Sequence, residues 1–203
     1  MIHPDTILRR VDDSVGFGVF ATRTIPRGTI TWALDPLDQL LDDEHVADAH
    51  RAMVDKYTYR TATGQRLLAW DLCRYMNHSC EANTFGTSLN LEIAVVDIQP
   101  GDQLTSDYAA LNLEPEESFD CLCGARRCRR WVADAQFEML AESWDTRIRD
   151  AFERIPIVEQ PLSSLLSDYP GVLAAALNPS LVPSILATRY LGPASADRRR
   201  KAG

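Results

Sequence analysis

The sequence lacks the features of a membrane or secreted protein. None of its apolar runs approaches the roughly 18 residues that a membrane-spanning helix requires. The first residues, Met1 to Asp5, lack the basic and apolar regions of a signal peptide. We therefore expect a cytoplasmic protein without a membrane partner.

Clustered basic residues are also scarce. The formal net charge is −8, and only Lys56 and Lys201 among the 21 basic residues are lysines, a bias typical of GC-rich bacterial genomes. A surface that binds phosphate groups needs clustered Lys and Arg. We therefore expect no direct contact with nucleic acid, and the acidic chain suits a cationic substrate better.

Size and composition are those of a soluble globular protein. The 203 residues are 45% hydrophobic and 25% charged, enough for one domain with an appendage but not for two large domains. The chain has only five cysteines, an odd number, and three of them lie within eight residues of one another. Without a secretory signal, this spacing favours a metal site over disulfides.

Short strands separated by Gly and Pro turns are expected in the first half of the chain. The expected strands cover residues 6–11, 19–22, 29–34, 57–60, 65–69 and 89–96, with a helix at 42–53. This pattern predicts an α+β, mainly β fold.

After residue 131 the pattern becomes helical. Apolar residues at helical spacing predict one long amphipathic helix over about 132–155, and shorter helical pieces are expected at 162–166, 172–177 and 181–190, before a basic tail at 197–203. The apolar stripe could pack on the core of the chain or on a second subunit. A homodimer through this helix is therefore a possibility that the sequence leaves open.

Three polar motifs follow one another along the chain. The first runs from Arg74 to Asn83 and crowds polar, ring-bearing and thiol side chains without an amphipathic period. The second runs from Gly101 to Tyr108, and the third, from Cys121 to Cys128, has the spacing Cys-x-Cys-x4-Cys. In this order and at these distances they resemble the signature of SET-domain protein lysine methyltransferases with a post-SET zinc knuckle. The resemblance extends from about Val15 to Cys128.

The resemblance implies a fold and an activity. The fold would be the SET fold, small β-sheets in which the two central motifs meet in a pseudo-knot. We expect a SET domain at 1–115, a post-SET zinc-binding segment at 116–131 and a helical C-terminal extension with a basic tail at 132–203. The implied activity is that of a stand-alone N-methyltransferase that takes the methyl group from S-adenosylmethionine and transfers it to protein lysine.

A glycine pair opens the matching region. Gly16-Phe17-Gly18 also fits a dinucleotide-binding turn, but such a turn must open a helix, and Pro26 within residues 25–28 would break that helix. By resemblance, Gly16, Phe17 and Gly18 are instead the loop whose backbone approaches the methionine end of S-adenosylmethionine, where a side chain would obstruct.

The motif Asn77-His78-Ser79-Cys80 is more specific. By resemblance, Asn77 and His78 bind the cofactor, whereas Arg74 and Asn83 support the structure. The alternative is a capped turn with a partly buried histidine.

Tyr108 is the implied catalytic residue and also contacts the cofactor. Methyl transfer to an amine is a positioning task that needs a neutral nucleophile and a polar oxygen beside the moving methyl group. The residue two positions earlier, often aromatic in the family, is Ser106 here. This small side chain predicts di- or trimethylated product. The tyrosine usual shortly after residues 26–28 is missing, and Trp32, Tyr57 or Tyr59 could replace it in the substrate channel.

The resemblance also completes the metal site. Cys121, Cys123 and Cys128 supply three thiolates, whereas a structural zinc site has four ligands. In the family the fourth ligand is the cysteine of the first motif, here Cys80, which leaves Cys73 over. The arginines at 126, 127, 129 and 130 are expected to be solvated.

Two other functions are compatible with the sequence. The acceptor could be a small polyamine or free amine, since no reader domain accompanies the motifs. The chain could also be a non-catalytic SET module that binds a partner, although the presence of Asn77, His78 and Tyr108 together argues against this.

Overall fold

The computed structural model describes residues 1–166 and 168–192, so the expected basic tail at 197–203 lies outside the described residues. The strands are β1 (Thr6–Asp12), β2 (Gly16–Ala21), β3 (Ile30–Ala33), β4 (Gln39–Leu41), β5 (Thr58–Arg60), β6 (Arg66–Leu68), β7 (Asn77–His78), β8 (Thr84–Gly86), β9 (Leu91–Ala94), β10 (Thr105–Ser106), β11 (Phe119–Asp120) and β12 (Trp131–Val132). The α-helices are α1 (Asp48–Tyr57), α2 (Gln136–Phe152) and α3 (Tyr169–Leu177). Short 3-10 helices used below are η1 (Asp43–His45), η2 (Leu72–Tyr75), η3 (Tyr108–Ala110) and η8 (Ile185–Thr188).

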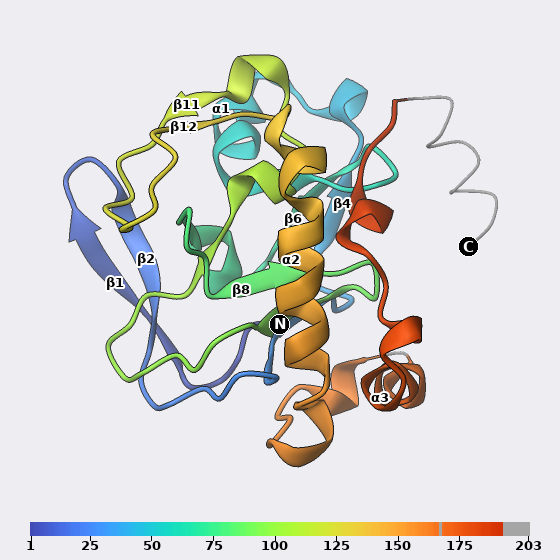
Figure 1. Ribbon diagram of the computed structural model, residues 1–203. Helices are drawn as coiled ribbons and strands as arrows, with labels where there is room; N and C mark the ends of the chain where they lie inside the picture. The colour runs from blue at the N-terminus through green and yellow to red at the C-terminus, as the bar shows by residue number, and fades with distance from the viewer. Residues whose placement is uncertain (167, 193–203) are drawn as a thin grey trace.

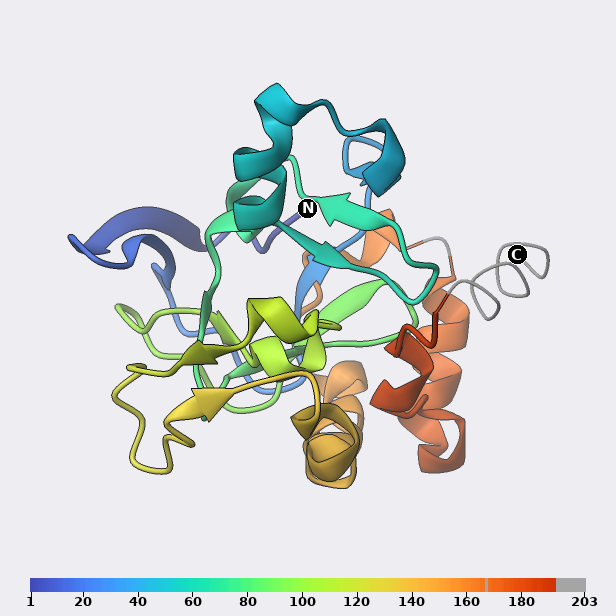
Figure 2. The same ribbon diagram turned by 90° about the horizontal axis from the view of Figure 1, so that it is seen from above.

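The strands form several small sheets. Antiparallel pairing gives the sheets β1-β2, β3-β9-β8, β4-β6-β5 and β11-β12, whereas β7 and β10 pair in parallel. The β1-β2 hairpin projects to one side, and α1 and α2 lie on opposite sides of the sheets (Figures 1 and 2). The expected α+β, mainly β fold with small sheets is confirmed.

The expected strands all occur, although their ends shift by a few residues. The predicted hairpin forms as β5 and β6, which reverse at Gly64, where φ is +85°. The predicted helix at 42–53 is wrong in part, because the extended backbone of Val46 and Ala47 separates η1 from α1.

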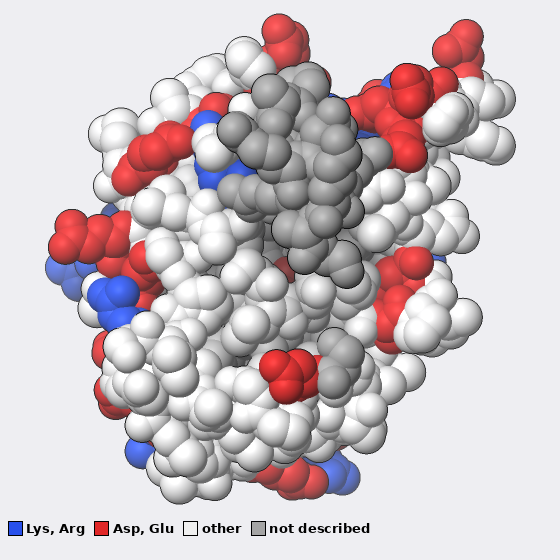
Figure 3. Space-filling view, turned by 90° about the vertical axis from the view of Figure 1, so that its right-hand side faces the viewer, with Lys and Arg blue, Asp and Glu red and all other residues white. Residues whose placement is uncertain are grey.

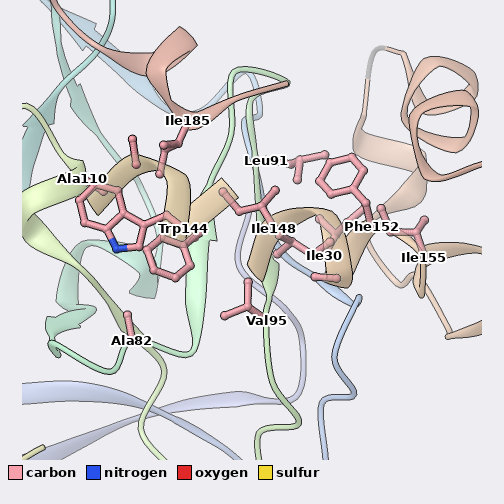
Figure 4. Close-up of a cluster of buried hydrophobic side chains, with 14 of the residues drawn as sticks. Ile30, Ala82, Leu91, Val95, Ala110, Trp144, Ile148, Phe152, Ile155 and Ile185 are labelled. Carbon is pink, nitrogen blue, oxygen red and sulfur yellow. The ribbon is translucent and has the colours of Figure 1, made fainter. Parts of the chain in front are cut away.

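The long C-terminal helix is shorter than expected. It begins at Gln136, since Val132 pairs with Phe119 in the β11-β12 sheet, and it ends at Phe152. Its buried apolar side chains include Trp144, Ile148 and Phe152, which Figure 4 shows packed against residues of the strands and of η8. The apolar stripe thus covers the core of its own chain, and a homodimer would need another surface.

The part of the chain that the structure describes contains no helix long and apolar enough to cross a membrane.

Candidate active site and metal centre

The parallel pair β7-β10 joins the first two motifs. Asn77 lies opposite Thr105 and His78 opposite Ser106, and the Ser79 N–H donates to the Ser106 carbonyl at 3.0 Å. Segments about 30 residues apart in the sequence thereby become neighbours. The predicted meeting of the two motifs is confirmed.

Tyr108 begins η3 directly after this pair. Its hydroxyl donates to the Met76 carbonyl at 2.8 Å, and the preceding Asp107 caps the turn by accepting from the Ala109 N–H. Burial raises the pKa of Tyr108 to about 12. The phenol is therefore neutral at physiological pH and works through hydrogen bonds, which is the protonation state that the predicted role requires.

The glycine pair lies beside Asn77. The Asn77 amide donates to the Phe17 carbonyl at 2.9 Å and to the Gln103 side-chain oxygen at 2.6 Å. A Cβ atom at Gly18 would overlap that Gln103 oxygen, whereas Gly16 has space but adopts a φ of +84°. The structure thus brings Gly16, Phe17, Gly18 and Asn77 together. Gln103, which sequence reasoning missed, holds them in place.

Two cavities adjoin at the site. The first, of about 350 Å³, is lined by Tyr57, Met76, Tyr108 and Phe119 among others. The second, of about 430 Å³, is lined by Trp32 and by residues of β8 and η8. Both volumes are typical of small-molecule sites. The residues that line both cavities form the boundary between them: Tyr59, Arg60, Leu67, Glu92, Ser106 and Leu111.

The predicted channel residues therefore occupy different places. Tyr59 and Ser106 lie at the boundary, Tyr57 lines only the first cavity and Trp32 only the second. The indole N–H of Trp32 is buried and has no hydrogen-bond partner among the described residues.

Three of the four predicted metal ligands, Cys80, Cys121 and Cys123, have their sulfur atoms within 4.8 Å of one another, and the Cys80 and Cys121 sulfur atoms are 3.7 Å apart. The fourth, Cys128, lies next to this group but outside that distance, and its thiol donates to the Cys121 carbonyl at 3.5 Å. Burial opposes ionisation of Cys123, but backbone N–H groups of Cys80 and Ala125 outweigh it and lower the pKa of this thiol to about 7. A cluster of cysteines with one easily ionised thiol fits the soft, thiolate-rich coordination of zinc.

Cys73 lies elsewhere. It is partly buried against a separate core cluster and lines the first cavity, and its sulfur is 3.8 Å from the Met76 sulfur.

His78 connects the cysteine cluster to Tyr108. Its Nε2 is 3.3 Å from the Cys80 sulfur. Four possible metal-ligand atoms therefore lie within 4.8 Å of one another, one from each of His78, Cys80, Cys121 and Cys123. Its Nδ1 accepts from the Tyr108 N–H at 3.1 Å. Burial lowers the pKa of His78 to about 4, which keeps the ring neutral. Any cofactor contact of His78 therefore uses other atoms than these two nitrogens.

Arg129 is not solvated as expected. Its guanidinium donates two hydrogen bonds to the buried Asp107 carboxylate, at 2.8 and 2.6 Å, and its backbone N–H donates to the Cys80 sulfur at 3.4 Å. Such a bidentate pair is a strong and specific contact. The other three arginines of this segment are exposed, and Arg127 pairs with Glu81 on the surface. Arg129 thus ties the cysteine segment to the residue before Tyr108.

The similarity to known proteins covers the segment that contains the glycine pair, Asn77, His78 and Tyr108. The family model of the SET domain matches residues 16–109. The chain is 36% identical over 66 residues to human histone-lysine N-methyltransferase 2B, which covers 29% of this chain and 2% of that protein. It is 29% identical over 160 residues to the H3 lysine-9 specific histone-lysine N-methyltransferase of Schizosaccharomyces pombe, with 58% and 31% covered.

A structural comparison finds KRYPTONITE in complex with mCHH DNA, an H3(1-15) peptide and SAH, at 21% identity and a TM-score of 0.45, covering 64% of this chain and 30% of that one. The chain thus spans less than a third of the length of each of these relatives.

Proposed function

We propose that this protein is an N-methyltransferase that transfers the methyl group of S-adenosylmethionine to the side-chain amine of protein lysine. The match of residues 16–109 to the family model of the SET domain supports this proposal. The observation that carries the proposal is the position of Tyr108, a neutral phenol that the β7-β10 pair holds at the wall of the first cavity. The human and fission-yeast relatives are named as histone-lysine methyltransferases, and the net charge of −8 suits a basic protein substrate.

The cofactor would supply an electrophilic methyl group on a sulfonium. The loop of Gly16, Phe17 and Gly18 and the adjacent Asn77 would hold it, together with His78. The first cavity, whose wall contains aromatic and apolar side chains, would exclude water from the reacting groups. The Tyr108 hydroxyl would orient the amine, so that catalysis consists of positioning and polarisation.

The four cysteines would hold one structural zinc ion. All four ligand positions are then filled, so the ion would act as a cross-link and not in catalysis. It would tie residues 121–128 to Cys80 and, through His78, to the backbone of Tyr108.

The experiment separates the acceptor classes. The protein is incubated with methyl-labelled S-adenosylmethionine and core histones, or with spermidine, and protein and small-molecule fractions are counted separately. We expect label in the histones, recovered as methyl-lysine after hydrolysis. Label in spermidine alone would support the polyamine alternative, and no label in either would support a non-catalytic module.

Tyr108→Phe is the matched control. It removes only the hydroxyl, so we expect turnover to fall by about 10²-fold or more, on the scale of other positioned polar groups, while the affinity for the cofactor stays unchanged. Unaltered turnover in this variant would contradict the role of Tyr108.

A further inference from the structure

Glu92 is a buried carboxylate between the two cavities. It lies in β9, where Leu91 and Ile93 face the core beneath α2, so the alternation of a strand directs Glu92 to the opposite face. It is 7% exposed and lines both cavities, as Ser106 and Tyr59 do. An acidic group therefore lies at the boundary between the two cavities.

The contacts of Glu92 do not neutralise its charge. Its Oε2 accepts from the Thr84 hydroxyl at 3.2 Å, and that hydroxyl is 3.3 Å from the Ser106 hydroxyl. The other ionisable groups that face it are Tyr59, Asp71 and Cys73, none of which is cationic.

The nearby arginines are already paired. The cationic side chains that line the first cavity with Glu92 are Lys56, Arg60, Arg66 and Arg74. The guanidiniums of Arg60 and Arg66 bond to Asp43, at 2.9 and 2.8 Å, and that of Arg74 donates to the Asp71 carbonyl at 3.1 Å. Among the described residues, no Lys or Arg lies within ion-pair distance of Glu92. An ionised carboxylate that is buried without a counter-ion is costly, so a cation that arrives with a ligand would stabilise it.

We propose that Glu92 binds the acceptor ammonium in the channel and takes one proton from it before methyl transfer. The inference rests on the proposed methyltransferase function. In the first step an N–H bond breaks and an O–H bond forms, giving a neutral amine and a carboxylic acid. The amine lone pair then forms the C–N bond while the electron pair of the breaking S–C bond stays on sulfur. The acid returns its proton to solvent after the methylated ammonium leaves.

The environment suits this role. Burial is the main cause that raises the pKa of Glu92 to about 7; the Thr84 and Ser106 hydrogen bonds oppose the rise, whereas the charge of Asp71 adds to it. A base with a pKa near the working pH is the most effective acceptor of a proton.

The test compares Glu92→Gln with Glu116→Gln, a matched change at an exposed residue that lines neither cavity. Rates of histone methylation are measured from pH 6 to 10 at saturating cofactor. Glutamine keeps an oxygen for the Thr84 hydroxyl, so a purely structural role would leave the pH profile unchanged. We expect kcat of Glu92→Gln to fall about 10²-fold at pH 7.5 and to recover towards pH 10, where the amine loses its proton unaided.

The wild type and Glu116→Gln should instead lose activity only below about pH 7, as Glu92 becomes protonated. Glu92→Asp retains a carboxylate on a shorter side chain. It should again lose activity only below about pH 7, as the wild type does, but with a lower rate at each pH. A Glu92→Gln variant with the wild-type rate and profile would overturn the inference and leave the proposed function intact. If neither the wild type nor Glu116→Gln methylates histones or spermidine, the proposed function fails, and the inference fails with it.

Discussion

Glu92→Gln should stabilise the protein at neutral and alkaline pH. The folded-state pKa of Glu92, about 7, lies above the ordinary value of 4.5, so the folded protein binds its proton more tightly than the unfolded chain does. The stability contributed by this group is therefore fully present below pH 4.5 and is lost as the pH rises through 7. One pKa unit corresponds to about 1.4 kcal/mol, so the rise from 4.5 to about 7 costs the ionised protein about 3 kcal/mol.

Glutamine does not titrate and avoids this cost. Urea unfolding of wild type, Glu92→Gln and the exposed control Glu116→Gln, each with saturating zinc, would be followed at pH 5 and pH 8.5. We compare the free energy of unfolding of each variant with that of the wild type. For Glu92→Gln this difference should increase by about 2 kcal/mol or more in favour of the variant from pH 5 to pH 8.5. For Glu116→Gln it should stay the same at both pH values. A constant difference between Glu92→Gln and the wild type would show that Glu92 titrates normally and that its burial is not what the structure indicates.

Three other changes test the metal site and the channel. Cys80→Ser should lose the bound zinc while Cys73→Ser keeps it, as metal analysis would show; equal zinc in both variants would refute the ligand assignment. Arg129→Ala leaves a buried carboxylate unpaired and should lower the free energy of unfolding by about 3 kcal/mol, whereas Arg127→Ala on the surface should change it by less than about 1 kcal/mol. Wild-type product should be di- or trimethylated, and Ser106→Tyr should shift it to monomethylated product in mass spectra; wild type that stops at one methyl group would contradict this use of Ser106.

The features that sequence reasoning predicted depend on local signals. Turns at Gly and Pro positions delimit strands such as β3, and the hairpin of β5 and β6 reverses at Gly64, because only glycine tolerates such φ values readily. The Cys-x-Cys-x4-Cys spacing of Cys121, Cys123 and Cys128 is also a local signal, because this spacing is typical of metal-binding segments.

What the sequence could not predict depends on partners far along the chain. Arg129 resembles its exposed neighbours, and only the fold shows that it meets Asp107, 22 residues away. The shortened α2 has a similar cause, because Val132 joins a strand pair with Phe119 although its apolar character also suits a helix. Glu92 did leave a signal: a carboxylate amid Leu91, Ile93 and Ala94 in a buried strand is rare and deserves a functional explanation.

The β7-β10 pair gives these separate observations a common structural cause. In β7, the His78 ring lies 3.3 Å from the Cys80 sulfur. Its partner in β10, Ser106, lines both cavities and lies 3.3 Å from the Thr84 hydroxyl. Arg129 closes the arrangement by binding the carboxylate that precedes Tyr108. Since packed interiors transmit small displacements, a shift of the cysteine segment would move the tyrosine hydroxyl relative to the first cavity. The cysteine cluster therefore helps to position the tyrosine, although no cysteine of the cluster lines the two cavities.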